Sequence, residues 1–71
     1  MNGYELLREY EKSLLEYWED GHGHSAVLIA EFQGFLTCLV RQCLIAESQY
    51  MYLVDCFIAK LSNIRKLDPT I

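Results

Sequence analysis

Apolar residues recur at helical spacing along most of this 71-residue chain. The longest pattern runs from residue 28 to residue 64, and its successive positions lie three or four residues apart, as on one face of an α-helix. Its positions are Leu28, Phe32, Phe35, Leu39, Cys43, Ala46, Tyr50, Leu53, Phe57, Leu61 and Ile64. Because this stripe keeps its phase throughout, it predicts one long helix over about residues 26–66.

A shorter amphipathic pattern precedes the stripe and predicts a helix over about residues 4–19. Its apolar face is formed by Leu6, Leu7, Tyr10, Leu14, Tyr17 and Trp18. Asn2 is a suitable N-cap for this helix, and Gly21 suits the left-handed position that often follows a helix. The turn at 20–25 is short, so the two helices should be antiparallel neighbours, with Ser25 capping the second.

The sequence therefore predicts an all-α fold built on an antiparallel helical hairpin. The short helix can cover only the first half of the long helix, and most residues from 44 to 67 are apolar. A soluble monomer does not leave an apolar surface of that size in water. Two hairpins are therefore predicted to pair as a homodimeric four-helix bundle.

The predicted dimer interface lies on the second half of the long helix. It comprises Leu44, Tyr50, Leu53, Val54, Phe57, Ile58, Leu61 and Ile64. Tyr52, Ile45 and Val27 point away from the stripe and are expected to remain at the surface. Arg41 and Gln42 interrupt an apolar run, and they mark either the solvent side of the helix or the polar part of a partner interface.

The alternative fold is a three-helix bundle with a turn near residues 47–49. The polar triplet Glu47-Ser48-Gln49 is the natural place for such a turn. The triplet contains neither glycine nor proline, and the stripe continues through it in phase, so the pattern favours the continuous helix. In both folds residues 1–71 form a single helical domain.

Composition narrows the classes of function. The net charge of −4 argues against nucleic acid as a partner, and basic residues cluster only at Lys60, Arg65 and Lys66. No apolar run is long enough for a membrane span. The odd number of cysteines and the absence of a signal-peptide pattern favour a cytoplasmic protein whose thiols are free and buried.

One cluster contains side chains of the type that bind metals, and it lies in the predicted turn. Asp20, His22 and His24 could hold zinc or nickel, and the alternative is a solvated turn, because no second set of ligands accompanies them. No serine or cysteine has an evident base beside it, and no glycine-rich phosphate loop follows a strand. The sequence therefore indicates neither an enzyme nor a cofactor.

The sequence predicts a non-catalytic protein–protein interaction module or small regulator that acts as a helical oligomer, of the co-chaperone, inhibitor or assembly-subunit type. Its expected partners are a second copy of the chain and another protein. Two alternatives belong to other classes. One is a metal-responsive protein that uses the turn with His22 and His24, and the other is a DNA-associated regulator that uses the basic end of the long helix.

Overall fold

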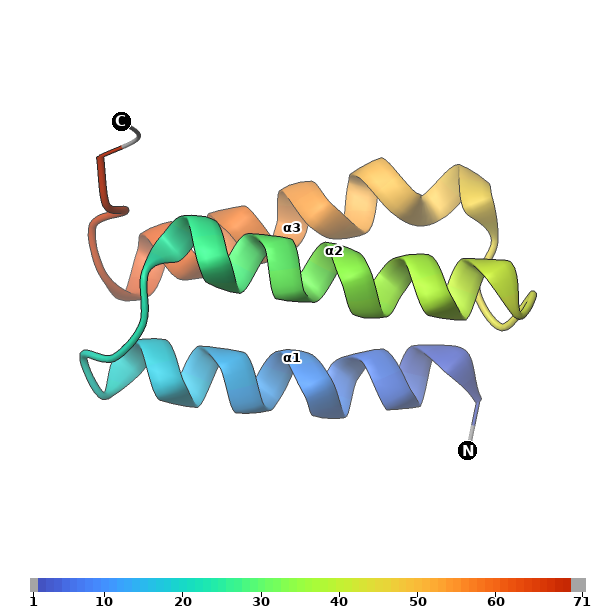
Figure 1. The fold of residues 1–71 in the computed structure, drawn as a ribbon, viewed down its shortest axis with the longest axis horizontal. Helices are drawn as coiled ribbons and strands as arrows, with labels where there is room; N and C mark the ends of the chain where they lie inside the picture. Colours follow the sequence, from blue (N-terminus) through green and yellow to red (C-terminus); the bar gives the residue numbers. More distant parts are fainter. Residues whose placement is uncertain (1, 70–71) are drawn as a thin grey trace.

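The computed structural model describes residues 2–69, in which three helices pack side by side, each running opposite to the one before it (Figure 1). Helix α1 spans Gly3–Glu19, α2 spans Ser25–Arg41 and α3 spans Tyr50–Ile64, and a short 3₁₀ helix, η1, lies at Glu47–Gln49. Residues 2–69 contain no strand. The all-α prediction is confirmed, the continuous helix over residues 26–66 is wrong, and the three-helix alternative fits.

Helix α1 begins and ends as the sequence predicts. The side chain of Asn2 accepts a hydrogen bond from the Glu5 amide at 2.9 Å, which satisfies one of the free amides at the start of the helix. After the helix, Gly21 and Gly23 have φ values of 85° and 79°, which glycine adopts without strain. The turn between α1 and α2 therefore follows from local sequence.

Helix α2 ends at Arg41, in the middle of the predicted long helix. The Leu44 amide donates to the Leu39 carbonyl at 2.9 Å and the Cys43 amide donates to the Val40 carbonyl at 3.0 Å, the paired bonds of a Schellman motif. Cys43 takes the left-handed position with φ of 59°, and no other non-glycine residue in the described part of the chain has a positive φ. The chain then changes direction and enters α3 through η1.

The apolar stripe keeps its phase across this connection by coincidence, since Cys43 and Ala46, two of its positions, are exposed. The change of direction packs α3 against α1 and α2, so the chain itself covers the apolar surface for which a second chain was predicted. Closing a short connection costs less entropy than bringing in a second molecule. Accordingly, the predicted interface residues Val54, Phe57 and Leu61 are buried in the core of the single chain.

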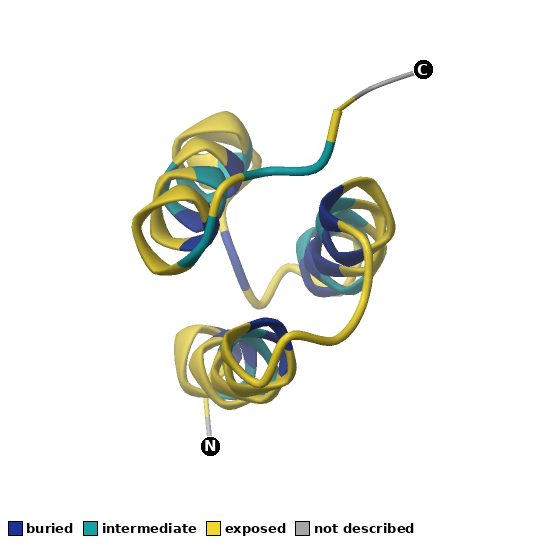
Figure 2. Cartoon of the chain, turned by 90° about the vertical axis from the view of Figure 1, so that its left-hand side faces the viewer, coloured by how far each residue is buried: buried dark blue, intermediate teal, exposed yellow. Residues whose placement is uncertain are grey.

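The core lies between the three helices, whose buried residues face one another in the end-on view (Figure 2). The rings of Phe32 and Phe57 stack with centroids 4.3 Å apart and join α2 to α3. Tyr10 stacks on Phe35 at the same distance and joins α1 to α2. Each large side chain buried in this way stabilises the fold by about 1.5–3 kcal/mol. The buried apolar residues are Leu7, Leu14, Trp18, Leu28, Phe32, Leu36, Leu39, Ile45, Val54, Phe57 and Leu61.

Two expectations about burial are wrong. Ile45 was expected at the surface, but only 3% of it is exposed, because the connection between α2 and η1 folds its side chain into the core. The cysteines were expected in the core, but Cys38 and Cys43 are exposed and Cys56 is half-buried. The break in the helix accounts for Ile45 and Cys43, which lie in the connection, whereas Cys38 and Cys56 lie within α2 and α3 on faces that the core does not fully cover.

Candidate protein-interaction surface

The two ends of the bundle differ in how they are closed. The turn end consists of the α1–α2 turn, residues 20–24, and the segment after α3, residues 65–69 (Figure 1). The η1 end consists of the start of α1, the connection and η1 over residues 42–49, and the first turn of α3. Side-chain hydrogen bonds between the turn and the segment after α3 hold the turn end together, and apolar side chains are exposed at both ends.

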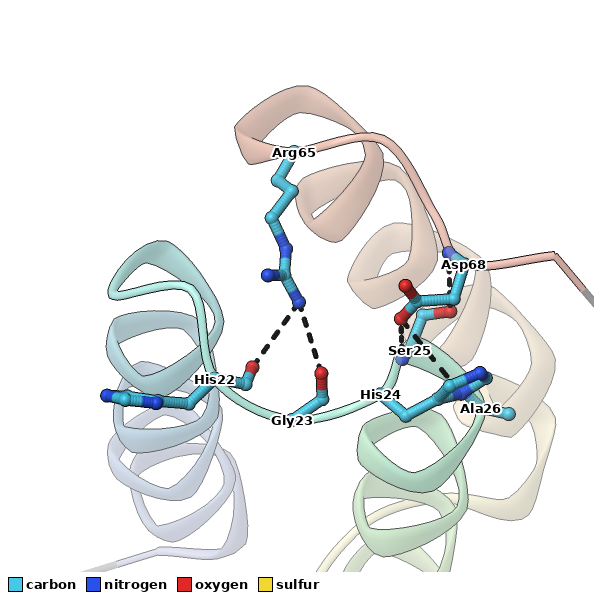
Figure 3. Close-up of polar contacts among 7 residues, drawn as sticks. All are labelled: His22, Gly23, His24, Ser25, Ala26, Arg65 and Asp68. Carbon is cyan, nitrogen blue, oxygen red and sulfur yellow. Dashed lines mark hydrogen bonds and ion pairs between the residues drawn. The ribbon is translucent and has the colours of Figure 1, made fainter.

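At the turn end, Arg65 fastens the segment after α3 to the α1–α2 turn (Figure 3). Its guanidinium carbon lies 3.5 Å from the centre of the Trp18 ring, which is a cation–π contact. Its Nη2 donates to the carbonyl oxygens of His22 at 3.4 Å and Gly23 at 3.2 Å. The Trp18 Nε1 donates to the Leu61 carbonyl at 2.9 Å within the core. One arginine thus ties the turn, α1 and the end of α3 together.

Asp68 caps α2 from the far end of the sequence (Figure 3). Its Oδ2 accepts from the Ser25 amide at 2.9 Å, and its own amide donates to the Ser25 Oγ at 3.1 Å. A carboxylate at the start of a helix is also favoured by the helix dipole. The Nδ1 of His24 accepts from the Ala26 amide at 3.2 Å, so the N-cap is His24 and the prediction that Ser25 caps this helix is wrong.

The predicted metal ligands Asp20, His22 and His24 do not come together as a ligand set. In the described range 2–69, no group of three or more histidine, cysteine, aspartate and glutamate side chains is placed to hold a metal ion. The His24 Nδ1 is engaged by the Ala26 amide, and the His22 ring lies beside Tyr17 with centroids 5.2 Å apart. The metal-responsive alternative stays a prediction, and it would need ligands from another molecule.

The basic side chains of the predicted DNA contact are largely used within the chain. Lys60 pairs with Glu11 of α1, and Arg65 is engaged at the turn end, so of the three only Lys66 has no ion pair or side-chain hydrogen bond within residues 2–69. A basic side chain that already has a partner in the protein contributes less free energy to binding a phosphate than a free one does. The DNA-associated alternative stays a prediction without support from this arrangement.

At the η1 end, an open groove of about 580 Å³ lies between the end of α2 and the start of α3. A second hollow of about 370 Å³ shares Val40 and Glu47 with the groove and extends along the connection to Leu44. We refer to the residues of both hollows that are not fully buried as the η1 surface: Thr37, Val40, Arg41, Cys43, Leu44, Ala46, Glu47, Tyr50 and Met51.

The η1 surface exposes large apolar side chains. Met51 is 63% exposed in the lining of the groove and Leu44 is 40% exposed in the second hollow. Tyr52 at 64% and Tyr4 at 41% are also exposed at the η1 end, outside both hollows. Four of the seven large hydrophobic residues exposed within residues 2–69 lie at this end of the bundle, and the other three, Tyr17, Val27 and Ile64, lie near the turn end. Exposed apolar residues that gather beside a groove mark an interaction site, whereas single scattered ones need no explanation.

Opposite charges flank the groove of the η1 surface. Arg41 ends α2 and Glu47 begins η1; both are exposed, and neither forms an ion pair within the described residues. The Thr37 hydroxyl donates to the Gln33 carbonyl at 2.8 Å and lies 3.4 Å from the Tyr50 hydroxyl. The groove therefore combines apolar side chains with hydroxyl groups and one unpaired charge of each sign.

The eight residues of the predicted interface fall into three environments. Leu44 and Ile64 are exposed; Tyr50, Leu53 and Ile58 are half-buried; Val54, Phe57 and Leu61 are buried. Only Leu44 and Tyr50 belong to the η1 surface. Met51 lies off the apolar stripe, so the spacing of apolar residues gave no signal for it. The signal that pointed to this end was the polar interruption at Arg41 and Gln42.

Two tyrosines outside the groove have shifted acidities. Burial, and then the charge of Glu31, raise the pKa of Tyr10 between α1 and α2. A hydrogen bond with Cys56, and then its charge, raise the pKa of the exposed Tyr52. Both shifts move the phenols further from the range that suits proton transfer at neutral pH.

No known protein family, curated protein or solved structure matches the chain. Across residues 2–69, no helix combines the length and the apolar composition needed to cross a membrane. The shape and chemistry of the η1 surface are therefore the observations from which we infer a function.

Proposed function

We propose that this chain is a non-catalytic protein-interaction module that acts as a helical oligomer, with the η1 surface as its contact surface. The observation that carries the proposal is the open groove at the η1 end, with Met51 exposed in its lining and Leu44 exposed in the adjoining hollow. Protein interfaces typically combine an apolar centre, enriched in aromatic residues and methionine, with a polar rim. Leu44, Tyr50 and Met51 supply such a centre, and Arg41 and Glu47 supply the rim.

The proposed homodimer differs in form from the one that the sequence predicted. Two long helices cannot form its seam, because α2 and α3 are separate helices. Instead, two three-helix bundles pair through their η1 surfaces. Each bundle has a core of its own, so the subunits fold first and associate in a second step that depends on concentration.

The size of the bundle sets the expected affinity. The chain measures 33 × 24 × 16 Å, and the η1 surface occupies one end of it. A standard interface buries about 800 Å² on each partner, so a contact confined to one end is small. We therefore expect a dissociation constant on the order of 10 µM rather than a permanent dimer.

Two free thiols at the surface bear on where such a module would act. Cys38 and Cys43 are both exposed and unpaired. Exposed free thiols persist in reducing compartments and oxidise in secretory ones. A cytoplasmic module is therefore part of the proposal.

Size-exclusion chromatography with light scattering tests the proposal at protein concentrations from about 5 to about 500 µM. The wild type should approach twice the mass of one chain as the concentration rises. Met51→Lys should shift the equilibrium toward the monomer, because it places a charge in the apolar contact. Val27→Lys is the matched control, since Val27 is 53% exposed near the opposite end of α2, and it should leave the mass unchanged.

Circular dichroism of each variant checks that the bundle remains folded, which we expect because both substitutions are at exposed helical positions. A wild type that stays monomeric over the whole range would overturn the proposal. So would dissociation by Val27→Lys to the same degree as by Met51→Lys, because the contact would then not lie at the η1 surface.

A further inference from the structure

The charges beside the groove indicate how two copies of the chain meet, an inference that rests on the proposed function. Arg41 and Glu47 both line the groove, carry opposite charges and have no partner within the described part of the chain. We propose that two η1 surfaces pair about a twofold axis, with Arg41 of each chain against Glu47 of the other and Met51 between the two ion pairs.

Twofold symmetry is what this charge arrangement fits. In a twofold interface the same surface of both subunits takes part, so every contact between two different residues is made twice. A groove that is lined by one free cation, one free anion and apolar side chains is therefore able to pair each charge with the opposite charge of a rotated copy. A surface with charges of one sign would repel its copy.

The net charge of the molecule also favours self-association through the η1 surface. The chain has a net charge of −4, so most pairs of faces of two identical chains repel each other. Helix α1, for example, exposes more acidic than basic side chains. The η1 surface carries one positive and one negative residue, so two copies approach there without net repulsion.

The ion pairs have a role in orientation more than in affinity. Exposed ion pairs contribute little free energy, whereas like charges placed against each other in an interface weaken it strongly. The apolar contact around Met51 would supply the affinity, and Arg41 and Glu47 would fix which way the second copy lies. Reversing one charge should therefore be far more harmful than removing one.

Charge exchange tests this pairing directly. Arg41→Glu alone sets carboxylates against carboxylates in both symmetry-related pairs, and Glu47→Arg alone sets guanidinium groups against each other. Each single variant should bind itself at least about tenfold more weakly than the wild type. An equimolar mixture of the two should form heterodimers, because both pairs are then complementary. The double variant Arg41→Glu/Glu47→Arg should dimerise like the wild type.

Lys12→Glu is the matched control for net charge. It makes the same change of charge as Arg41→Glu on an exposed residue of α1, and it should leave the dimer unchanged at moderate salt. Equal weakening by Lys12→Glu and Arg41→Glu would show that net charge acts alone, and it would overturn the pairing. Failure of the mixture to form heterodimers would overturn it as well.

The result also separates this inference from the proposed function. A wild-type dimer that Met51→Lys dissociates, but that neither single charge reversal affects, would overturn the twofold pairing and leave the η1 surface as the contact. A wild type that is monomeric throughout the concentration range would overturn both. Heterodimers in the mixture, together with weakened single variants, would support both.

Discussion

A proline at position 47 separates the two folds between which the apolar pattern does not distinguish. In a continuous helix over residues 26–66, Glu47→Pro would remove a hydrogen bond and clash with the preceding turn, at a cost of about 3 kcal/mol or more. In the structure Glu47 is the first residue of η1. Proline is well tolerated at the first position of a helix, because the amide there has no partner within the helix.

The backbone on both sides of this position fits a proline. Ala46 has φ of −69° and ψ of 135°, the extended conformation to which proline confines the residue before it. A 3₁₀ helix has φ between about −50° and −70°, which matches the proline ring. Glu47 forms no ion pair within residues 2–69 that the substitution would break. Glu47→Pro should therefore leave the free energy of unfolding unchanged or raise it by about 0.4–1 kcal/mol, because the unfolded chain loses freedom.

Urea unfolding, followed by helical circular dichroism and by the fluorescence of the single tryptophan, measures this change. The protein must be dilute, so that self-association adds nothing to the measured stability. Thr37→Pro is the matched control: it lies within α2 and should cost about 3 kcal/mol or more. A loss of more than about 2 kcal/mol for Glu47→Pro would refute the break between α2 and α3.

Three further predictions use the same urea titration. Gly3→Ala should cost about 1–3 kcal/mol, because the added Cβ would meet the Leu44 carbonyl oxygen and lie 2.7 Å from the Leu44 Cβ. Gly34→Ala is its control: apart from its chain neighbours and the backbone of its own helix, no atom lies within 4 Å of the added Cβ, and the free energy of unfolding should rise by about 0.5–1 kcal/mol. Cys43→Gly should raise the free energy of unfolding by about 1 kcal/mol, since glycine adopts a φ of 59° without strain. A lower free energy of unfolding would contradict the Schellman end of α2. Arg65→Ala should cost about 1–2 kcal/mol and alter the emission of the indole that the guanidinium covers, with Arg65→Met, which keeps most of the stem, losing less. Unchanged emission in Arg65→Ala would contradict that contact.

Much of the helical structure could be predicted from short-range sequence. The cap at Asn2 and the left-handed turn at Gly21 each depend on residues that are close together in the sequence. The two ends of α1 could therefore be predicted from local chemistry. The spacing of apolar positions marked Leu28, Phe32 and Phe57 on the buried faces of α2 and α3, because side chains three or four residues apart share a face of a helix. It did not mark the buried Leu36, which lies off the stripe.

The break between α2 and α3 could not be predicted in the same way. Cys43 takes the left-handed position without the glycine that usually marks it, and the polar triplet of η1 contains no proline. The continuous helix and the bundle both bury Val54, Phe57 and Leu61, the first fold against a second chain and the second fold against α1 and α2. The chain folds back because α3 then buries Val54 and Phe57 within the same molecule, at a smaller entropic cost.

The candidate site was likewise predictable from the sequence only in part. The sequence marked the polar interruption at Arg41, but the groove beside it and the exposure of Met51 depend on where α3 lies against α2. The hydrogen bonds between Asp68 and Ser25 join residues that are 43 positions apart, so no local sequence pattern predicts them. Hydrophobic periodicity determines which face of a helix is buried. Only the packing of the helices decides what covers that face, because the covering groups come from distant parts of the chain.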